Sequence, residues 1–104
     1  MTNYYIVKFV HTDLLGWQEH LEAHVKYLYQ LTTKGYLAIS GPIENEDEQR
    51  KEAYLILKAD NEQKLQTLLE NDPYWYEGLV AEYTVEEWKP MFGDLNNLTI
   101  NRPF

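Results

Sequence analysis

The order of the hydrophobic patterns along this chain constrains its fold more than any other feature of the sequence. Two stretches with helical spacing of apolar residues alternate with stretches rich in β-branched and aromatic residues. The predicted strands cover residues 4–10, 36–43, 53–59 and 79–88, and the predicted helices cover residues 15–34 and 61–70. With a pair of right-handed crossovers, this βαββαβ order predicts an α+β, ferredoxin-like fold: a four-stranded antiparallel sheet with both helices on one face.

Residues typical of helix ends mark the limits of the predicted helices. Gly35 follows the first helix at the position where glycine commonly ends a helix. Asp60 or Asn61 is the predicted N-cap of the second helix, because short polar side chains accept hydrogen bonds from the first helical N–H groups. Further along, Asp72 precedes Pro73, which predicts that Asp72 caps a short helical turn.

Alternation along the strands predicts one sheet face covered by the helices and one opposite face. The covered face collects Tyr5, Val7, Phe9, Leu37, Ile39, Leu55, Leu57, Leu79, Ala81, Tyr83 and Val85. The opposite face collects Tyr4, Ile6, Lys8, Tyr36, Ala38, Ser40, Tyr54, Ile56, Lys58, Glu82 and Thr84. Because the second set mixes apolar rings with hydroxyls and charges, we expect a second copy of the chain to cover it, with water or a small ligand sharing the space. The alternative is a half-exposed sheet with ordinary surface tyrosines.

One position on the apolar stripe of the first predicted helix is a histidine. The stripe consists of Trp17, Leu21, His24, Leu28 and Leu31, at steps of four and three residues. His24 is therefore expected to face the core, where a polar ring costs free energy unless it has a hydrogen-bond partner. The sequence predicts such a partner elsewhere in the chain.

Asp72 is a candidate for this partner. It follows the second predicted helix, and both helices are expected on the same face of the sheet, so its carboxylate can approach His24. A carboxylate that accepts from one ring nitrogen fixes the tautomer of a histidine and raises the basicity of the other nitrogen, as in a general base. Capping and histidine binding remain alternative roles for Asp72 at this point.

Composition limits the functional classes open to this chain. It has 104 residues and no cysteine, which predicts one domain without disulfides, thiolate nucleophiles or cysteine-ligated metals. The nine basic residues are scattered and the formal net charge is -8, so we expect no nucleic-acid partner. No stretch approaches the ~20 apolar residues of a membrane span, and residues 1–10 lack a signal-peptide pattern. We therefore expect no membrane partner and a cytoplasmic location. Residues 44–52 have no apolar side chain and are a predicted solvated loop.

Several spaced motifs resemble a known family. They are HVKYL at 24–28, GYL at 35–37, SGP at 40–42, DPY at 72–74 with GL at 78–79, and WKP at 88–90 before Phe92. Across roughly residues 3–92 they resemble the YciI-like family of the dimeric α+β barrel superfamily. Members often carry a basic residue shortly before the motif histidine, whereas this chain has Leu21, Glu22 and Ala23.

This resemblance implies a ferredoxin-like monomer whose sheet pairs with another copy, a dimeric α+β barrel. It also implies a catalytic centre built from the motif histidine and the motif aspartate, here His24 and Asp72. A related dehydrochlorinase of chloroaromatic degradation is the clearest enzymatic precedent. We expect residues 1–92 to form the domain, and residues 93–104 to form a tail that is frayed or packed on a partner.

A metal site is an alternative to this interpretation. His20 and His24 are four residues apart, a spacing that allows both to bind one ion, with Glu22 between them. The zinc-protease pattern needs its glutamate directly after the first histidine, and here Glu22 is expected on the opposite helix face. With no clear third ligand, we expect no metal and no cofactor.

Two functions follow from these residues. The first is a small cofactor-independent enzyme in which His24, oriented by Asp72, moves a proton on a small carbonyl, enol or hydroxyaromatic substrate. The candidate substrate-binding residues are Ser40, Tyr36, Tyr74 and Tyr27. The alternative is a non-catalytic dimeric protein that binds a small molecule, in which His24 is a hydrogen-bonded polar group of the core.

Overall fold

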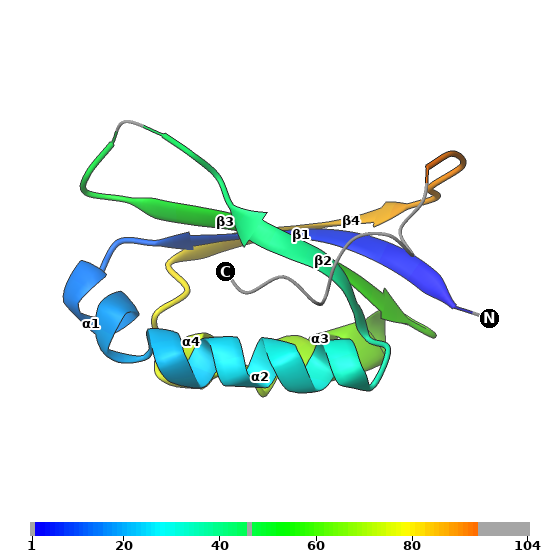
Figure 1. Ribbon diagram of the computed structural model, residues 1–104, viewed down its shortest axis with the longest axis horizontal. Helices are drawn as coiled ribbons and strands as arrows, with labels where there is room; N and C mark the ends of the chain where they lie inside the picture. Colours follow the sequence, from blue (N-terminus) through cyan, green and yellow to red (C-terminus); the bar gives the residue numbers. More distant parts are fainter. Residues whose placement is uncertain (1, 46, 94–104) are drawn as a thin grey trace.

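The computed structural model describes residues 2–45 and 47–93 of the chain. The described helices and strands are β1 (Asn3–His11), α1 (Leu14–Glu19), α2 (Leu21–Thr33), β2 (Leu37–Pro42), β3 (Lys51–Ala59), α3 (Glu62–Glu70), α4 (Pro73–Tyr76) and β4 (Glu82–Trp88) (Figure 1). The strands form one antiparallel sheet in the order β2-β3-β1-β4. The helices α2, α3 and α4 lie beneath one face of this sheet (Figure 1). This arrangement confirms the predicted ferredoxin-like α+β fold.

Apolar side chains of α2, α3 and the first three strands form the core. The buried cluster consists of Tyr5, Val7, Phe9, Leu31, Leu37, Leu55, Leu57, Ala59, Leu65, Leu68 and Leu69. Full burial of one large apolar side chain contributes about 1.5–3 kcal/mol, so these residues fix both long helices against the sheet.

The residues that end α2 and begin α3 are among those that the sequence predicts for these positions. Gly35 has φ of +84° and follows α2, and the N–H of Tyr36 bonds the carbonyl of Leu31, a pattern that closes the helix end. The Asn61 side chain, rather than that of Asp60, caps α3 by accepting a hydrogen bond from the N–H of Lys64 at 2.8 Å.

The predicted helix 15–34 is interrupted at His20, so the prediction of one continuous helix was wrong. Asp13 caps α1, and Gly16 lies so close to Leu79 that a Cβ at this glycine would be 2.5 Å from the leucine Cδ2. These contacts hold α1 against Leu79, whereas α2 packs along the sheet. The axes of α1 and α2 therefore point in different directions (Figure 1). The apolar spacing of the sequence continues across His20, so it gives no sign that the helix axis changes there.

An irregularity in β2 reverses the predicted faces of two residues. The pairing with β3 shifts by one residue between Leu37 and Ile39. Beyond the shift, Ser40 pairs with Leu55 on the helix-covered face, and Ile39 pairs with Ile56 on the open face. The predicted positions of Ile39 and Ser40 were therefore wrong, because a bulge moves every later side chain to the other face.

Several strand limits also differ from the predicted ones. β3 begins at Lys51, which pairs with His11, so Lys51 and Glu52 belong to a strand and not to the predicted loop. His11 itself is the last residue of β1 rather than a loop residue. β4 begins at Glu82, and residues 79–81 form a connection outside the sheet.

The edge strand β4 is exposed along its whole length. Tyr83 and Val85 pair with β1 residues of the helix-facing side, as predicted, but they are 45% and 36% exposed and do not belong to the core. Trp75 covers part of Tyr83, with ring centroids 4.8 Å apart. The expectation of burial was wrong here because the helices do not extend over this edge.

No described element covers the sheet face opposite the helices (Figure 1). Its apolar side chains, which we call the open-face patch, are Tyr4, Ile6, Ile39, Tyr54, Ile56 and Trp88. The ammonium of Lys8 and the carboxylate of Glu52 form a 2.8 Å ion pair on the same face.

No helix in the described ranges is long and apolar enough to cross a bilayer. Apart from Gly93, the predicted tail 93–104 lies outside the described residues.

Candidate active site

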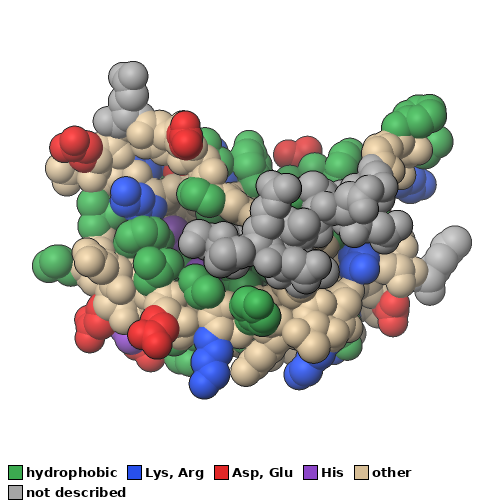
Figure 2. Space-filling model, viewed as in Figure 1, with side chains coloured by type: hydrophobic (Ala, Val, Ile, Leu, Met, Phe, Trp, Pro, Cys, Tyr) green, Lys and Arg blue, Asp and Glu red, His purple; other side chains and the backbone are tan. Residues whose placement is uncertain are grey.

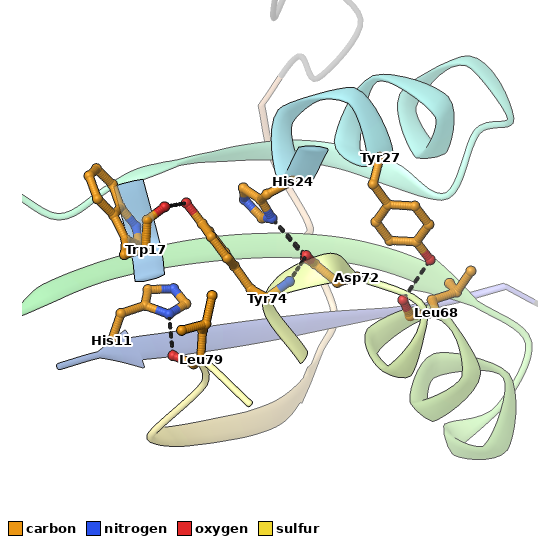
Figure 3. Close-up of polar contacts among 8 residues, drawn as sticks. All are labelled: His11, Trp17, His24, Tyr27, Leu68, Asp72, Tyr74 and Leu79. Atoms are coloured by element: carbon orange, nitrogen blue, oxygen red, sulfur yellow. Dashed lines mark hydrogen bonds and ion pairs between the residues drawn. The ribbon is translucent and has the colours of Figure 1, made fainter. Parts of the chain in front are cut away.

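His24 and Asp72 are in direct contact. The Nδ1 atom of His24 lies 2.9 Å from both carboxylate oxygens of Asp72 (Figure 3). Both side chains are largely enclosed, with 12% and 3% of their surface exposed. Because an ionised carboxylate only accepts hydrogen bonds, Nδ1 carries the hydrogen, and the lone pair of the neutral ring lies on Nε2.

The local sequence around α4 explains where Asp72 lies. Asp72 is the N-cap of α4 and its Oδ1 accepts a hydrogen bond from the N–H of Tyr74 at 2.9 Å. Pro73 fills the first helical position, where a missing N–H costs nothing. The predicted turn is confirmed, and its cap fixes the carboxylate next to α2.

Tyr74 lies between two histidines. Its ring stacks on His24 at a centroid distance of 4.2 Å and contacts His11 on the other side at 4.6 Å. Its hydroxyl donates to the carbonyl of Trp17 at 2.9 Å. Burial, together with the negative charge of Asp72, raises the pKa of Tyr74, so the phenol stays protonated and serves as a platform for the imidazole rings.

His11 is the second imidazole of this cluster, and it is only 2% exposed. Its Nδ1 lies 2.8 Å from the carbonyl oxygen of Leu79, which accepts the hydrogen bond (Figure 3). Burial lowers the pKa of His11, and the hydrogen bond to Leu79 opposes this effect. The repulsive charge of a protonated His24 lowers the pKa further.

The two histidines line a groove of ≈ 1040 Å³ between α1, α2 and the β2–β3 hairpin. Histidine side chains are visible inside this hollow in Figure 2. Other lining residues are Phe9, Trp17, Leu21, Val25, Leu28, Ser40, Lys51, Leu55 and Tyr74. The groove wall is largely apolar around the two histidines, the usual character of a site for a small organic molecule, whereas its hairpin side carries the charged residues Glu44, Asp47, Glu48, Arg50 and Glu52.

The residues proposed from sequence fall into two groups. His24, Ser40 and Tyr74 line the groove, whereas Asp72, Tyr27 and Tyr36 are not among its lining residues, and Asp72 is connected to the groove through His24. The Tyr27 hydroxyl donates to the carbonyl of Leu68 at 2.6 Å, and burial and the charge of Asp72 raise the pKa of Tyr27 to about 12.

Tyr36 lies beyond the opposite end of α2. The ammonium of Lys64, on α3, lies 4.8 Å from the centroid of the Tyr36 ring. Tyr36 packs against the core and α3, so its predicted place on the open face was wrong, because β2 begins only at Leu37. Its carbonyl accepts a hydrogen bond from the N–H of Lys58 at the sheet edge.

Sequence reasoning missed His11 and the β2–β3 hairpin as parts of this groove. His11 continues the two-residue alternation of Tyr5, Val7 and Phe9, a signal that would have placed its ring on the helix-covered face. The hairpin residues between Glu44 and Glu52 have no such pattern. Which of them line the groove depends on the path of the loop in three dimensions, and the sequence does not show that path.

His20 and His24 contact different carboxylates. His20 Nε2 lies 3.8 Å from an oxygen of Glu77, whereas His24 contacts Asp72. Within residues 2–45 and 47–93, no cluster of three or more histidine or acidic side chains has the arrangement to hold a metal ion.

Fold and site together define a class of protein: a small ferredoxin-like α+β domain with a histidine–carboxylate pair in a groove beside the sheet. The YCII-related domain model matches residues 4–89. The chain belongs to the YCII-related domain family, which confirms the resemblance seen in the sequence motifs.

Three solved structures with the same fold are informative. One is 5-chloro-2-hydroxyhydroquinone dehydrochlorinase (TftG) from Burkholderia phenoliruptrix AC1100 in complex with 2,5-dihydroxybenzoquinone, with 25% identity, a TM-score of 0.70, and coverage of 83% of this chain and 93% of that chain. An uncharacterised protein from Thermotoga maritima has 18% identity and a TM-score of 0.54, over 86% of this chain and 100% of that chain. A dimeric ferredoxin-like protein from an uncultured marine organism has 12% identity and a TM-score of 0.52, over 89% of this chain and 92% of that chain. No curated protein matches the sequence.

Proposed function

We propose that this chain is a small cofactor-independent enzyme in which His24, held by Asp72, transfers protons on a hydroxylated aromatic, enol or carbonyl substrate. The observation that carries this proposal is the contact of Nδ1 with both Asp72 oxygens at 2.9 Å, in a histidine that lines a largely apolar groove. The similarity to a dehydrochlorinase of a hydroxylated ring supports the substrate class.

In the proposed reaction, Nε2 of His24 takes a proton from a hydroxyl or an acidic carbon of the substrate. The electron pair of the broken bond enters the substrate and either expels a leaving group with its own pair or forms an enolate. In an isomerisation the imidazolium then returns the proton at another atom. Asp72 stays ionised throughout and stabilises the imidazolium, so no oxidant or reductant is needed.

We also propose that the active form is a homodimer paired through the open-face patch. The patch consists of exposed and half-buried aromatic and aliphatic side chains on a sheet face that no described element covers. The ferredoxin-like protein from the marine organism, which has the same fold, is a dimer. Pairing of two such faces would remove the patch from water.

The first experiment measures chloride release from 5-chloro-2-hydroxyhydroquinone by the wild type and by the variants His24→Ala and Asp72→Asn. We expect activity in the wild type and a loss of about 10²–10⁴-fold in kcat for each variant, the usual contribution of a positioned general base. Asparagine at position 72 keeps an oxygen that can cap α4, so its effect reports on the carboxylate charge.

His20→Ala is the matched control, because His20 lies on the same segment but outside the groove lining. Its kcat should equal that of the wild type. If His24→Ala and Asp72→Asn retain wild-type kcat, the proposed base is wrong. If the wild type binds the chlorinated hydroxyquinol but releases no chloride and returns no isomer, the non-catalytic binding protein replaces the enzyme.

A further inference from the structure

We propose that His11 is a second ligand-binding residue of the groove, and that its Nε2 accepts a hydrogen bond from a hydroxyl group of the bound molecule. The proposed enzyme function requires only His24 and Asp72 and leaves this buried imidazole without a role. His11 therefore adds a specificity element to the site.

The first argument is the tautomer of His11. A carbonyl oxygen only accepts hydrogen bonds, so the 2.8 Å contact with Leu79 places the hydrogen on Nδ1. The lone pair of the neutral ring is then on Nε2, which can accept a hydrogen bond but cannot donate one. The chain thus presents a fixed acceptor in an otherwise mostly apolar groove wall.

The second argument is the surroundings of Nε2. No described group forms a hydrogen bond with this atom, and His11 is a lining residue of the groove. In the described part of the chain, no fully buried side-chain nitrogen or oxygen lacks a hydrogen-bond partner. We infer that Nε2 opens onto the groove, where a ligand or water supplies its partner.

Burial is the main influence that favours the neutral form of the His11 ring. Burial lowers the pKa of His11, and a protonated His24 acts in the same direction, whereas Asp72 acts in the opposite one. Lys51 is the cross-strand partner of His11, and its ammonium lies 5.4 Å from the Trp17 ring centroid. The lowered pKa keeps His11 neutral, and therefore an acceptor, near neutral pH.

The third argument is the arrangement of the two imidazoles. They contact the same Tyr74 ring, at centroid distances of 4.2 Å for His24 and 4.6 Å for His11. A small molecule that reaches both Nε2 atoms must carry two separated polar groups, one at the base and one hydroxyl at His11. This favours rings with two hydroxyl groups over compounds with a single oxygen. The reaction at His24 rests on the proposed function, whereas the His11 contact does not.

The test is ¹⁵N NMR of the imidazole rings of the full chain at pH 7.5, with 1,4-dihydroxybenzene kept reduced under anaerobic conditions. Before addition, the spectrum should show His11 as the neutral tautomer with its hydrogen on Nδ1. Saturation with 1,4-dihydroxybenzene should move the His11 Nε2 resonance upfield, the direction expected for a nitrogen that accepts a hydrogen bond. The dimethyl ether of the same ring, which has no hydroxyl hydrogen, should leave that resonance unmoved.

A matched variant is His11→Asn, whose side-chain amide retains a donor at the position of Nδ1 and removes Nε2. We expect His11→Asn to weaken binding of 1,4-dihydroxybenzene about tenfold, the effect of one hydrogen bond, and to leave binding of the dimethyl ether unchanged. His20→Asn should change neither affinity, because His20 does not line the groove.

An unmoved Nε2 resonance at saturation would overturn the proposal, and so would failure of the wild type to bind the dihydroxy compound. If His11→Asn weakened the binding of 1,4-dihydroxybenzene and of its dimethyl ether equally, the proposal would also be overturned, since the substitution would then only disturb the structure of the groove. Loss of the base function gives a different result: if the Nε2 resonance moves but no proton transfer occurs at His24, the enzyme proposal fails and the His11 contact stands.

Discussion

At the residue scale, one carboxylate links the fold to the proposed chemistry. Oδ1 of Asp72 accepts hydrogen bonds from both the N–H of Tyr74 and Nδ1 of His24, each at 2.9 Å. A carboxylate oxygen has two lone-pair directions, so the two contacts do not compete. The helix cap of α4 therefore holds the group that orients the histidine.

A pH prediction follows from the buried His11. Its pKa in the folded protein is lowered from the ordinary value of 6.5, so the unfolded chain binds more protons as the pH falls through that value. The stabilisation from the neutral ring is present above pH 6.5 and is lost progressively as the pH falls from 6.5 toward the lowered folded pKa. Urea unfolding should show the wild type losing stability over this range.

His11→Asn removes the titrating group and provides the comparison. The difference in free energy of unfolding between wild type and His11→Asn should shrink as the pH decreases below 6.5. A difference that is constant between pH 8 and pH 5 would contradict the assignment of His11 as a buried neutral ring.

At the element scale, the packing of α1 depends on a glycine. A Cβ at Gly16 would lie 2.5 Å from Cδ2 of Leu79 and 2.8 Å from Oδ2 of Asp13. Gly16→Ala should therefore cost about 1–3 kcal/mol of stability, as overpacking does, even though alanine is the better helix former. The change should appear as a lower urea midpoint with an unchanged m-value.

Gly41→Ala is the control for this variant. A Cβ added at Gly41 would have no neighbour within 4 Å, and this glycine has no positive φ, so its replacement should alter stability by no more than about 0.5 kcal/mol. If Gly16→Ala is as stable as Gly41→Ala, the close packing of α1 on Leu79 does not limit the fold.

The bulge in β2 changes which side chains belong to the candidate site. It places Ser40 on the helix-covered face, where this residue lines the groove. A regular strand would have placed the hydroxyl on the open face. Alternation assigns faces only while the register is unbroken, and the sequence around Ser40 contains no feature that locates the extra residue.

At the scale of the whole molecule, the open-face patch is the proposed dimer interface. Tyr54 lies on this patch and is 47% exposed in the single chain. Tyr54→Glu should shift a dimer to monomer at micromolar concentration, because a charge would lose its water at the interface and the neighbouring Lys8 is already paired with Glu52. Size-exclusion chromatography with light scattering measures this directly.

Tyr76→Glu is the matched control, since Tyr76 is 63% exposed on α4, away from the sheet face. It should leave the mass unchanged. A wild type that is monomeric at micromolar concentration would remove the proposed dimer, as would a Tyr54→Glu variant with the same mass as the wild type.

Most of the fold was predictable because its signals are local. The alternation in β1, the apolar stripe of α2, the glycine after that helix and the Asp72–Pro73 cap each depend on residues a few positions apart. Their order then leaves few topologies for the sheet. The single continuous helix and the burial of β4 were wrong because a helix axis and the coverage of an edge depend on distant neighbours.

The sequence by itself determined the class of fold, the inward position of His24 and the capping role of Asp72, since each follows from spacing and side-chain chemistry. Only the tertiary structure decided that Asp72 reaches His24 across 48 positions of the chain, and that His11 and Tyr74 complete the cluster. The physical reason is that spacing fixes which way a side chain faces along its own element. Packing of elements against one another fixes which side chains meet.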